Sequence, residues 1–229
     1  MSTDHLIKRH TFSDLTSLSE ALARSAAITL RNAIAQHGQA SLVVPGGHTP
    51  ATYLPRLAQM DLPWQQVFIT LSDERWVEPT SEQSNERLVH EHFLQHMPRQ
   101  PRFIPLKTEC AHPDQAITGL NERLFGLPLP FSLVILGLGT DGHIASLFPG
   151  MTLDMNSASL CQTATPPAAP SLRISLSLRA LVNSERIVLV ISGKEKRQRV
   201  DRLIALPDPN IPFVRLMQLK PVELFETDS

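Results

Sequence analysis

The chain has 229 residues, of which 42% are hydrophobic and 19% are charged, and its formal net charge is −1. This composition is ordinary for a globular protein, and the charge gives no electrostatic case for binding nucleic acid or an anionic membrane. Cys110 and Cys161 are too few and too far apart for a zinc site or a disulfide framework. The polar segment Met1–His10 does not resemble a signal peptide, and no apolar run reaches bilayer-spanning length. We therefore expect one cytoplasmic, monomeric domain over residues 1–229, without a metal.

Hydrophobic periodicity predicts strands that alternate with helices. In chain order, the pattern predicts a helix over residues 17–36, a strand over 41–44, a helix over 49–59, a strand over 67–71, helices over 84–95 and 114–124, strands over 132–136, 172–176 and 186–191, and a helix over 194–204. Residues 157–171 are expected to form a loop, and residues 213–219 and 222–225 weaker extended segments. This alternation indicates an α/β fold: a single domain with a mostly parallel sheet and helices on both faces.

Four of the predicted strands end in residues that can carry chemistry. These segments are Gly46–Thr49, Asp73–Arg75, Asp141–His143 and Gly193–Lys194. The carboxyl ends of parallel strands lie on one edge of a sheet, and ligands of open α/β sheets collect there. We therefore expect the four segments to meet around one ligand.

The segment after the strand at 132–136 holds one aspartate and one histidine between glycines. His143 lies at the end of a buried strand, two residues from Asp141, which is the placement of a general base. The spacing Gly137-x-Gly139-x-x-Gly142 also matches the dinucleotide-binding fingerprint. However, residues 157–171 resemble a loop where the second strand of that motif should lie. We therefore favour a general base over a nicotinamide cofactor.

The turn at 46–49 has the features of a phosphate cradle. Gly46 and Gly47 leave backbone amides free to point at an anion, the following helix adds its dipole, and the Thr49 hydroxyl can donate. Lys194 follows another predicted strand and can reach a phosphate as a point charge.

Taken together, these motifs resemble the 6-phosphogluconolactonase family. The resemblance rests on the turn at 46–50, Ser72–Val77, Ser84-Asn85, the long motif from Gly137 to Pro149, Arg173-Ile-Ser, and Gly193-x-x-Lys196. It implies a modified Rossmann-type α/β fold, like that of glucosamine-6-phosphate deaminase/isomerase. It also implies hydrolysis of 6-phospho-D-glucono-1,5-lactone to 6-phosphogluconate in the pentose phosphate pathway, with no required cofactor.

The resemblance also implies roles for individual residues. His143 is the general base that activates water, and Asp141 orients the imidazole or its loop. Arg75 stabilises the oxyanion or orients the lactone, and Asp73 fixes Arg75. The substrate phosphate is held by Gly46, Gly47, Thr49, Arg173 and Lys194, while the Gly-x-x-Lys pattern leaves Lys196 as a second candidate.

Two alternative functions are open at this stage. Relatives with glucosamine-6-phosphate deaminase activity carry a glutamate five residues after the motif histidine, and Phe148 stands at that position here. Phenylalanine can neither accept nor donate a proton, which favours the lactonase. A sugar-phosphate-sensing regulatory domain would need a DNA-binding segment, and the residues before the first predicted strand form only one helix and a polar tail.

Overall fold

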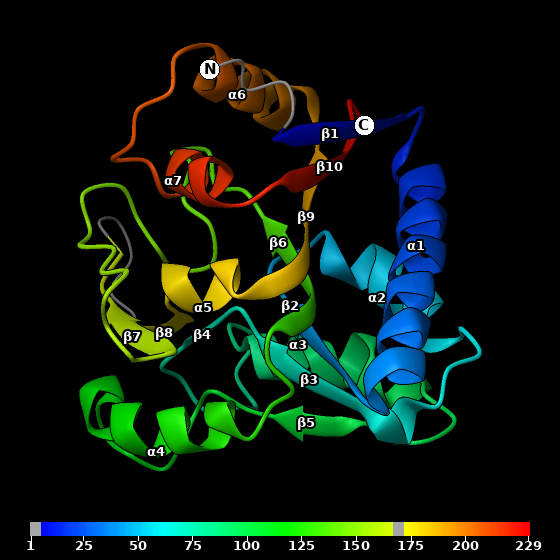
Figure 1. The fold of residues 1–229 in the computed structure, drawn as a ribbon, viewed down its shortest axis with the longest axis vertical. Helices are drawn as coiled ribbons and strands as arrows, with labels where there is room; N and C mark the ends of the chain where they lie inside the picture. Colours follow the sequence, from blue (N-terminus) through cyan, green and yellow to red (C-terminus); the bar gives the residue numbers. More distant parts are fainter. Residues whose placement is uncertain (1–5, 167–171) are drawn as a thin grey trace.

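The protein is built around a seven-stranded parallel sheet (Figure 1). The computed structural model describes residues 6–166 and 172–229. The strand order is β1-β10-β9-β6-β2-β3-β5, and every neighbouring pair runs parallel. The strands are β1 (Ile7–Phe12), β2 (Ala40–Val44), β3 (Val67–Leu71), β5 (Arg102–Ile104), β6 (Phe131–Gly137), β9 (Ser184–Ser192) and β10 (Val222–Thr227).

A second, antiparallel sheet begins where β3 ends. It contains β4 (Asp73–Arg75), β8 (Arg173–Leu176) and β7 (Cys161–Ala164), in the order β4-β8-β7. Ser72 joins the two sheets, because its N–H donates to the carbonyl of Val44 and its own carbonyl accepts from Leu176 N–H. The polar residues after β3 therefore continue as a strand of their own.

Helices cover both faces of the parallel sheet. In Figure 1, α1 and α2 lie on one side of the sheet, and α5 and α7 lie on the other. This arrangement confirms the predicted α/β class. The helices are α1 (Leu15–His37), α2 (Pro50–Ala58), α3 (Asn85–His92), α4 (Pro113–Phe125), α5 (Leu178–Val182), α6 (Lys194–Ala205) and α7 (Pro212–Leu219), with 3-10 turns at Trp64–Gln66 and Leu94–His96.

The longest helix, α1, has well-defined ends. The Asp14 carboxylate accepts a hydrogen bond of 2.8 Å from Ser17 N–H at the start of the helix. Gly38 ends it with a left-handed φ of 76°. Within the described residues, no helix combines the length and the apolar character needed to cross a membrane.

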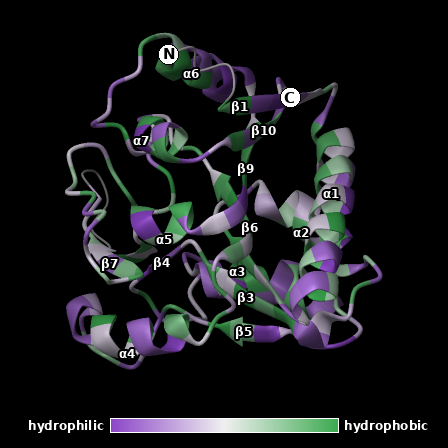
Figure 2. Ribbon diagram, in the orientation of Figure 1, coloured by the Kyte–Doolittle hydropathy of each residue, from purple (hydrophilic) through white to green (hydrophobic). Residues whose placement is uncertain are grey.

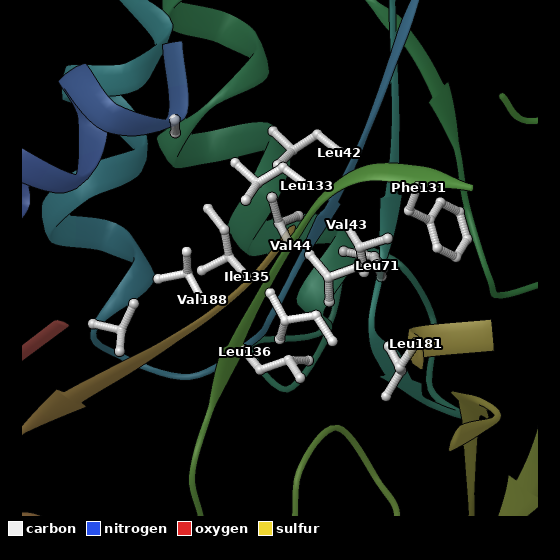
Figure 3. Packing of buried hydrophobic residues seen from close by; sticks show 14 of the residues in the cluster. Leu42, Val43, Val44, Leu71, Phe131, Leu133, Ile135, Leu136, Leu181 and Val188 are labelled. Atoms are coloured by element: carbon white, nitrogen blue, oxygen red, sulfur yellow. The ribbon is translucent and has the colours of Figure 1, made fainter. Parts of the chain in front are cut away.

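The centre of the sheet is apolar on both faces. Figure 2 shows hydrophobic colouring along β6, whereas hydrophilic stretches are frequent on α1 and α4. Leu42 of β2 pairs with Leu133 of β6, both are completely buried, and Figure 3 shows them beside each other in the core. Strands that are covered on both faces are continuous apolar runs rather than alternating patterns. This is why the central strands could be predicted from short apolar runs.

The prediction of an extended segment over residues 213–219 is wrong, because these residues form α7. Pro212 occupies the first turn of this helix, where its missing N–H costs nothing. Phe213, Val214, Leu216 and Met217 are buried, so most of this short helix is apolar. Periodicity alone cannot separate such a run from a buried strand.

Two strands lie in segments that the sequence predicts to be irregular. The strand β1 begins within the polar segment 1–10 and pairs with β10 at the edge of the sheet, and residues 1–5 lie outside the described residues. The predicted loop over 157–171 contains β7, and its residues 167–171 are likewise outside the described part. An edge strand keeps polar side chains in water, so β1 lacks the apolar run that marks the central strands.

Candidate active site

A cavity of about 340 Å³ lies at the carboxyl ends of the parallel strands. It is centred on β2 and β6, which are adjacent in the sheet. From β2 the chain continues to β3 on one side, and from β6 it continues to β9 on the other side. Such a switch point is where open α/β sheets bind ligands. Three of the four predicted segments line the cavity, and α6 adds a lysine. The polar and glycine residues that concern the site are Gly46, Gly47, Thr49, Asp73, Arg75, Asn85, Gly139, His143, Arg173 and Lys196.

The turn between β2 and α2 forms one wall of the cavity. Gly47 has a φ of 94°, a left-handed conformation that favours glycine. Thr49 precedes α2 and makes no side-chain capping hydrogen bond, so its hydroxyl is not committed to the helix. The first N–H groups of a helix lack partners within it and carry the positive end of its dipole. This wall is therefore suited to an anion.

His143 and Asp141 form a close pair on the loop after β6. His143 Nδ1 lies 2.6 Å from Asp141 Oδ1, and the same oxygen accepts from His143 N–H at 3.0 Å. Burial opposes ionisation of Asp141, but these contacts with His143 outweigh it and lower the pKa of the carboxyl. With Nδ1 facing the carboxylate, Nε2 is the ring nitrogen left to exchange a proton with a ligand.

Gly139 provides the space in which this pair sits. A Cβ at this position would lie 2.1 Å from His143 Nδ1 and 2.8 Å from Asp141 Oδ1. Gly139 N–H also donates to the carbonyl of His143 at 2.9 Å, which closes the loop. The glycine therefore fixes both the ring and the backbone that carries it.

Phe148 lies against both His143 and Arg173. Its ring centroid is 4.9 Å from that of His143, and the Arg173 guanidinium carbon lies 5.6 Å from the same ring. Phe148 is only 5% exposed. Phe148 therefore forms an apolar wall beside the imidazole of His143.

The expectation that Asp73 fixes Arg75 is wrong. Arg75 Nη1 instead donates to Asn85 Oδ1 at 2.7 Å and to the Gln83 carbonyl at 2.9 Å. The Asp73 carboxylate accepts from Ser146 Oγ at 2.6 Å and from Ser72 Oγ at 2.9 Å. Asp73 and Arg75 are two residues apart in β4 and so lie on the same face of the strand, but each side chain is held by other partners.

Ser146 connects Asp73 to the loop that carries His143. It is fully buried, and it follows Ala145, which has a left-handed φ of 49°. A left-handed non-glycine residue is uncommon and stores strain, which is typical of functional sites. Arg173 Nη1 lies 3.4 Å from the same Ser146 Oγ. The serine is thus committed to a buried network and is not presented as a nucleophile.

Arg75 and Arg173 face each other across the small sheet. They are directly paired in the register of β4 and β8, a position in which like charges are unfavourable. Burial, together with the nearby charge of Arg75, lowers the pKa of Arg173, while Asp73 and Glu74 oppose the shift. Among the described residues, Arg173 Nε is buried without a hydrogen-bond partner. Two close guanidinium groups at one cavity point to an anionic ligand.

Glu74, between these residues, has a structural role. Its carboxylate accepts from the N–H groups of Asn85 at 2.8 Å and Glu86 at 2.7 Å, and from Ser84 Oγ at 2.9 Å. Burial raises the pKa of Glu74, and these hydrogen bonds oppose the rise. The side chain holds the N-terminus of α3 beneath the cavity, which places Asn85 beside Arg75.

Of the two candidate lysines, Lys196 lines the cavity. Lys194 is the first residue of α6, is exposed, and is not among the residues that line this cavity. The sequence argument favoured Lys194 because it directly follows the end of a strand. One half-turn of helix separates the two positions, and only the direction of α6 decides between them.

Sequence reasoning assigned no role to Asn85 or Ser146, although both stand in the motifs. Their hydrogen bonds to Arg75 and Asp73 become visible only when α3 and the loop after β6 are placed against β4. In the described part of the chain, no group of three or more His, Cys, Asp or Glu side chains is placed to hold a metal ion.

The parallel sheet, the cavity at its switch point and the pair of His143 and Asp141 define a Rossmann-like α/β enzyme for a small anionic molecule. The chain belongs to the family of glucosamine-6-phosphate isomerases and 6-phosphogluconolactonases, whose sequence profile matches residues 13–224.

Individual relatives support this membership over nearly the whole chain. A 6-phosphogluconolactonase of Mesorhizobium japonicum is 36% identical over 221 residues, which cover 93% of this chain and 92% of that protein. One from Caulobacter vibrioides is 36% identical over 223 residues, covering 93% of each chain. The crystal structure of a 6-phosphogluconolactonase from Shewanella baltica superposes with a TM-score of 0.91 at 35% identity, covering 96% of this chain and 97% of that one.

The space at Gly139 gives a direct test of whether the position of the His143–Asp141 pair matters for turnover. In Gly139→Ala the new methyl group must displace the His143 ring, and a misplacement of this size costs about 100-fold in turnover. The matched control is Gly119→Ala in α4, where a Cβ meets no atom within 4 Å. Steady-state kinetics and thermal melts of both variants check this. Unchanged turnover in Gly139→Ala would show that the ring position is not critical.

Proposed function

We propose that the protein hydrolyses 6-phospho-D-glucono-1,5-lactone to 6-phospho-D-gluconate, a reaction of the pentose phosphate pathway, which we place in the cytoplasm. The observation that carries this proposal is the pair of His143 and Asp141 at a cavity that also holds two opposed arginines. An activated water and a stabilised oxyanion are what ester hydrolysis requires. The names of the relatives support the same substrate.

In the proposed reaction, His143 Nε2 takes a proton from water as the water oxygen attacks C1 of the lactone. Asp141, on Nδ1, holds the imidazole in the required tautomer and stabilises the positive charge that the ring gains. Arg75 stabilises the negative charge on the C1 oxygen. The imidazolium then returns the proton to the ring oxygen as the C1–O bond breaks. A lactone is already an activated ester, so no covalent nucleophile is needed.

The phosphate of the substrate is assigned to the turn between β2 and α2. Gly46, Gly47 and Thr49 offer backbone N–H groups and a hydroxyl there, and Arg173 and Lys196 add positive charge. Lys194, which the sequence argument favoured, lies outside the cavity lining, so we assign its role to Lys196. Asp73 contributes indirectly, since it holds Ser146, which in turn contacts Arg173.

The deaminase is the second candidate, because the family profile covers both activities. That reaction must open an amino-sugar ring and move a proton between C1 and C2. The ring of Phe148 lies 4.9 Å from His143, where the relay glutamate would have to act. An apolar ring cannot transfer a proton, and this favours the lactonase.

Replacing the base should remove most of the activity. We expect His143→Ala to lower kcat by about 100- to 10,000-fold, the share that a general base contributes, while 6-phosphogluconate binding measured by calorimetry is retained. Loss of freshly made lactone is followed against its spontaneous hydrolysis. His37→Ala, a histidine with a 57% exposed side chain on α1, is the control. Near-wild-type turnover of a folded His143→Ala protein would remove His143 from the mechanism.

Removing the phosphate from the substrate should be costly. Two charge-assisted hydrogen bonds at roughly 1.5–3 kcal/mol each predict a kcat/KM for unphosphorylated gluconolactone that is lower by about 100- to 10,000-fold. Lys196→Ala should narrow this difference and Lys194→Ala should not, because only Lys196 lines the cavity. Equal kcat/KM values for the two lactones would contradict the phosphate assignment.

The protein should release no ammonia from glucosamine 6-phosphate, even at high enzyme concentration, because Phe148 cannot act in the proton relay. A coupled ammonia assay, run beside the lactone assay on the same preparation, measures this. Ammonia release at a rate that rivals lactone hydrolysis would reverse the assignment.

A further inference from the structure

We propose that Asn85 is a positioning residue that holds Arg75 over the cavity and couples it to the glycine turn between β2 and α2. This inference rests on the proposed function, since Arg75 is assigned there to the oxyanion. Asn85 is 1% exposed, lies at the first turn of α3 and lines the cavity.

The hydrogen bonds of the Asn85 side chain leave it one orientation. Its Oδ1 accepts from Arg75 Nη1 at 2.7 Å, and its Nδ2 donates to the Asp73 carbonyl at 2.8 Å. Turning the amide over would set two donors against each other on one side and two acceptors on the other. The backbone is fixed as well, because Asn85 N–H donates to the buried Glu74 carboxylate at 2.8 Å.

Arg75 needs this support because a neighbouring positive charge repels its guanidinium group. It is paired across the small sheet with Arg173, whose positive charge repels it. Within the described residues, the hydrogen bonds of its guanidinium go to the neutral oxygens of Asn85 and Gln83. Neutral partners hold the group without cancelling its charge, so the full positive charge is available to a developing oxyanion.

The same amide fills the space beside Gly46. A Cβ at Gly46 would lie 1.9 Å from Asn85 Oδ1 and 2.2 Å from its Cγ. Gly46 does not have a left-handed φ, and the three atoms that an added Cβ would meet first all belong to the Asn85 side chain. The wall assigned to the phosphate and the arginine assigned to the lactone are therefore in contact through one amide.

The first test is Asn85→Ala, assayed with phosphorylated lactone. Losing one hydrogen bond to a charged group predicts a fall in kcat of about 10- to 100-fold, with a smaller change in KM. The matched control is Asn121→Ala on α4. Asn121 also makes side-chain hydrogen bonds on both sides of its amide, to Ile117, Ser159 and Leu160, and none of these residues lines the cavity. The control should melt at a lower temperature but keep its kcat.

The second test is a double-mutant cycle that combines Gly46→Ala with Asn85→Ala. With Asn85 present, the new methyl group should displace the amide and lower kcat by a similar factor. In the Asn85→Ala background, where the three side-chain atoms nearest to the new methyl group are gone, the same change should lower kcat by a much smaller factor than it does with Asn85 present. A Gly46→Ala variant that raises only KM, with or without Asn85, would show that the glycine serves the phosphate alone and would overturn the coupling.

The outcomes distinguish a failure of the proposed function from a failure of the positioning role of Asn85. A wild-type protein that does not hydrolyse the lactone refutes the proposed function itself. Active wild-type protein together with a folded Asn85→Ala variant of unchanged kcat refutes the positioning role. If Asn85→Ala does not fold, the comparison of Gly46→Ala with wild type decides, since that variant keeps every hydrogen-bonding group of the chain.

Discussion

The pairing of β2 with β6 is the constraint on which the site depends. These strands are adjacent in space but separated by nearly ninety residues, with Leu42 in register with Leu133. From β2 the chain builds the sheet toward β5, and from β6 it builds toward β9, so the two connections diverge and leave a crevice between them. The glycine turn follows one strand and the loop of His143 follows the other. The apolar core below them fixes this distance, because close-packed side chains resist small shifts.

Charge in the site is arranged by means of neutral partners. Arg75 is held by an amide and a carbonyl, and Asp73 by two hydroxyl groups. Had these two side chains formed an ion pair, as the sequence suggested, each would have been neutralised. The buried Glu74 carboxylate is satisfied by N–H groups at the start of α3 and by a hydroxyl. The cavity therefore keeps a surplus of positive charge for an anionic substrate.

Much of this arrangement could be predicted from the sequence, and the exceptions have physical reasons. The central strands and the residues of the glycine turn and the His143 loop follow from apolar runs and local motifs, which are short-range signals. The helix α7 was missed because a short apolar run has no distinctive period, and β1 because an edge strand keeps polar residues. Lys196 and Asn85 depend on the direction of α6 and the position of α3, which are set by tertiary packing. The partner of Arg75 was assigned wrongly because Asn85, which accepts its hydrogen bond, reaches the guanidinium only once α3 is packed against β4.

The structure gives two of the glycines a different role from the one that the sequence suggests. From the sequence, glycines beside a predicted ligand site suggest backbone freedom, and Gly47 has the left-handed φ that this requires. Neither Gly46 nor Gly139 has a left-handed φ, and what each provides is room for a neighbouring side chain: the Asn85 amide in one case and the imidazole of His143 in the other. The Asn85 amide positions Arg75, which we assign to the reacting carbonyl. The imidazole of His143 is itself assigned to that reaction. Because a lactone demands little chemical activation, the reaction depends mainly on the position of these groups. Gly46 and Gly139, which follow the two strands of the switch point, therefore belong to the catalytic arrangement that we propose.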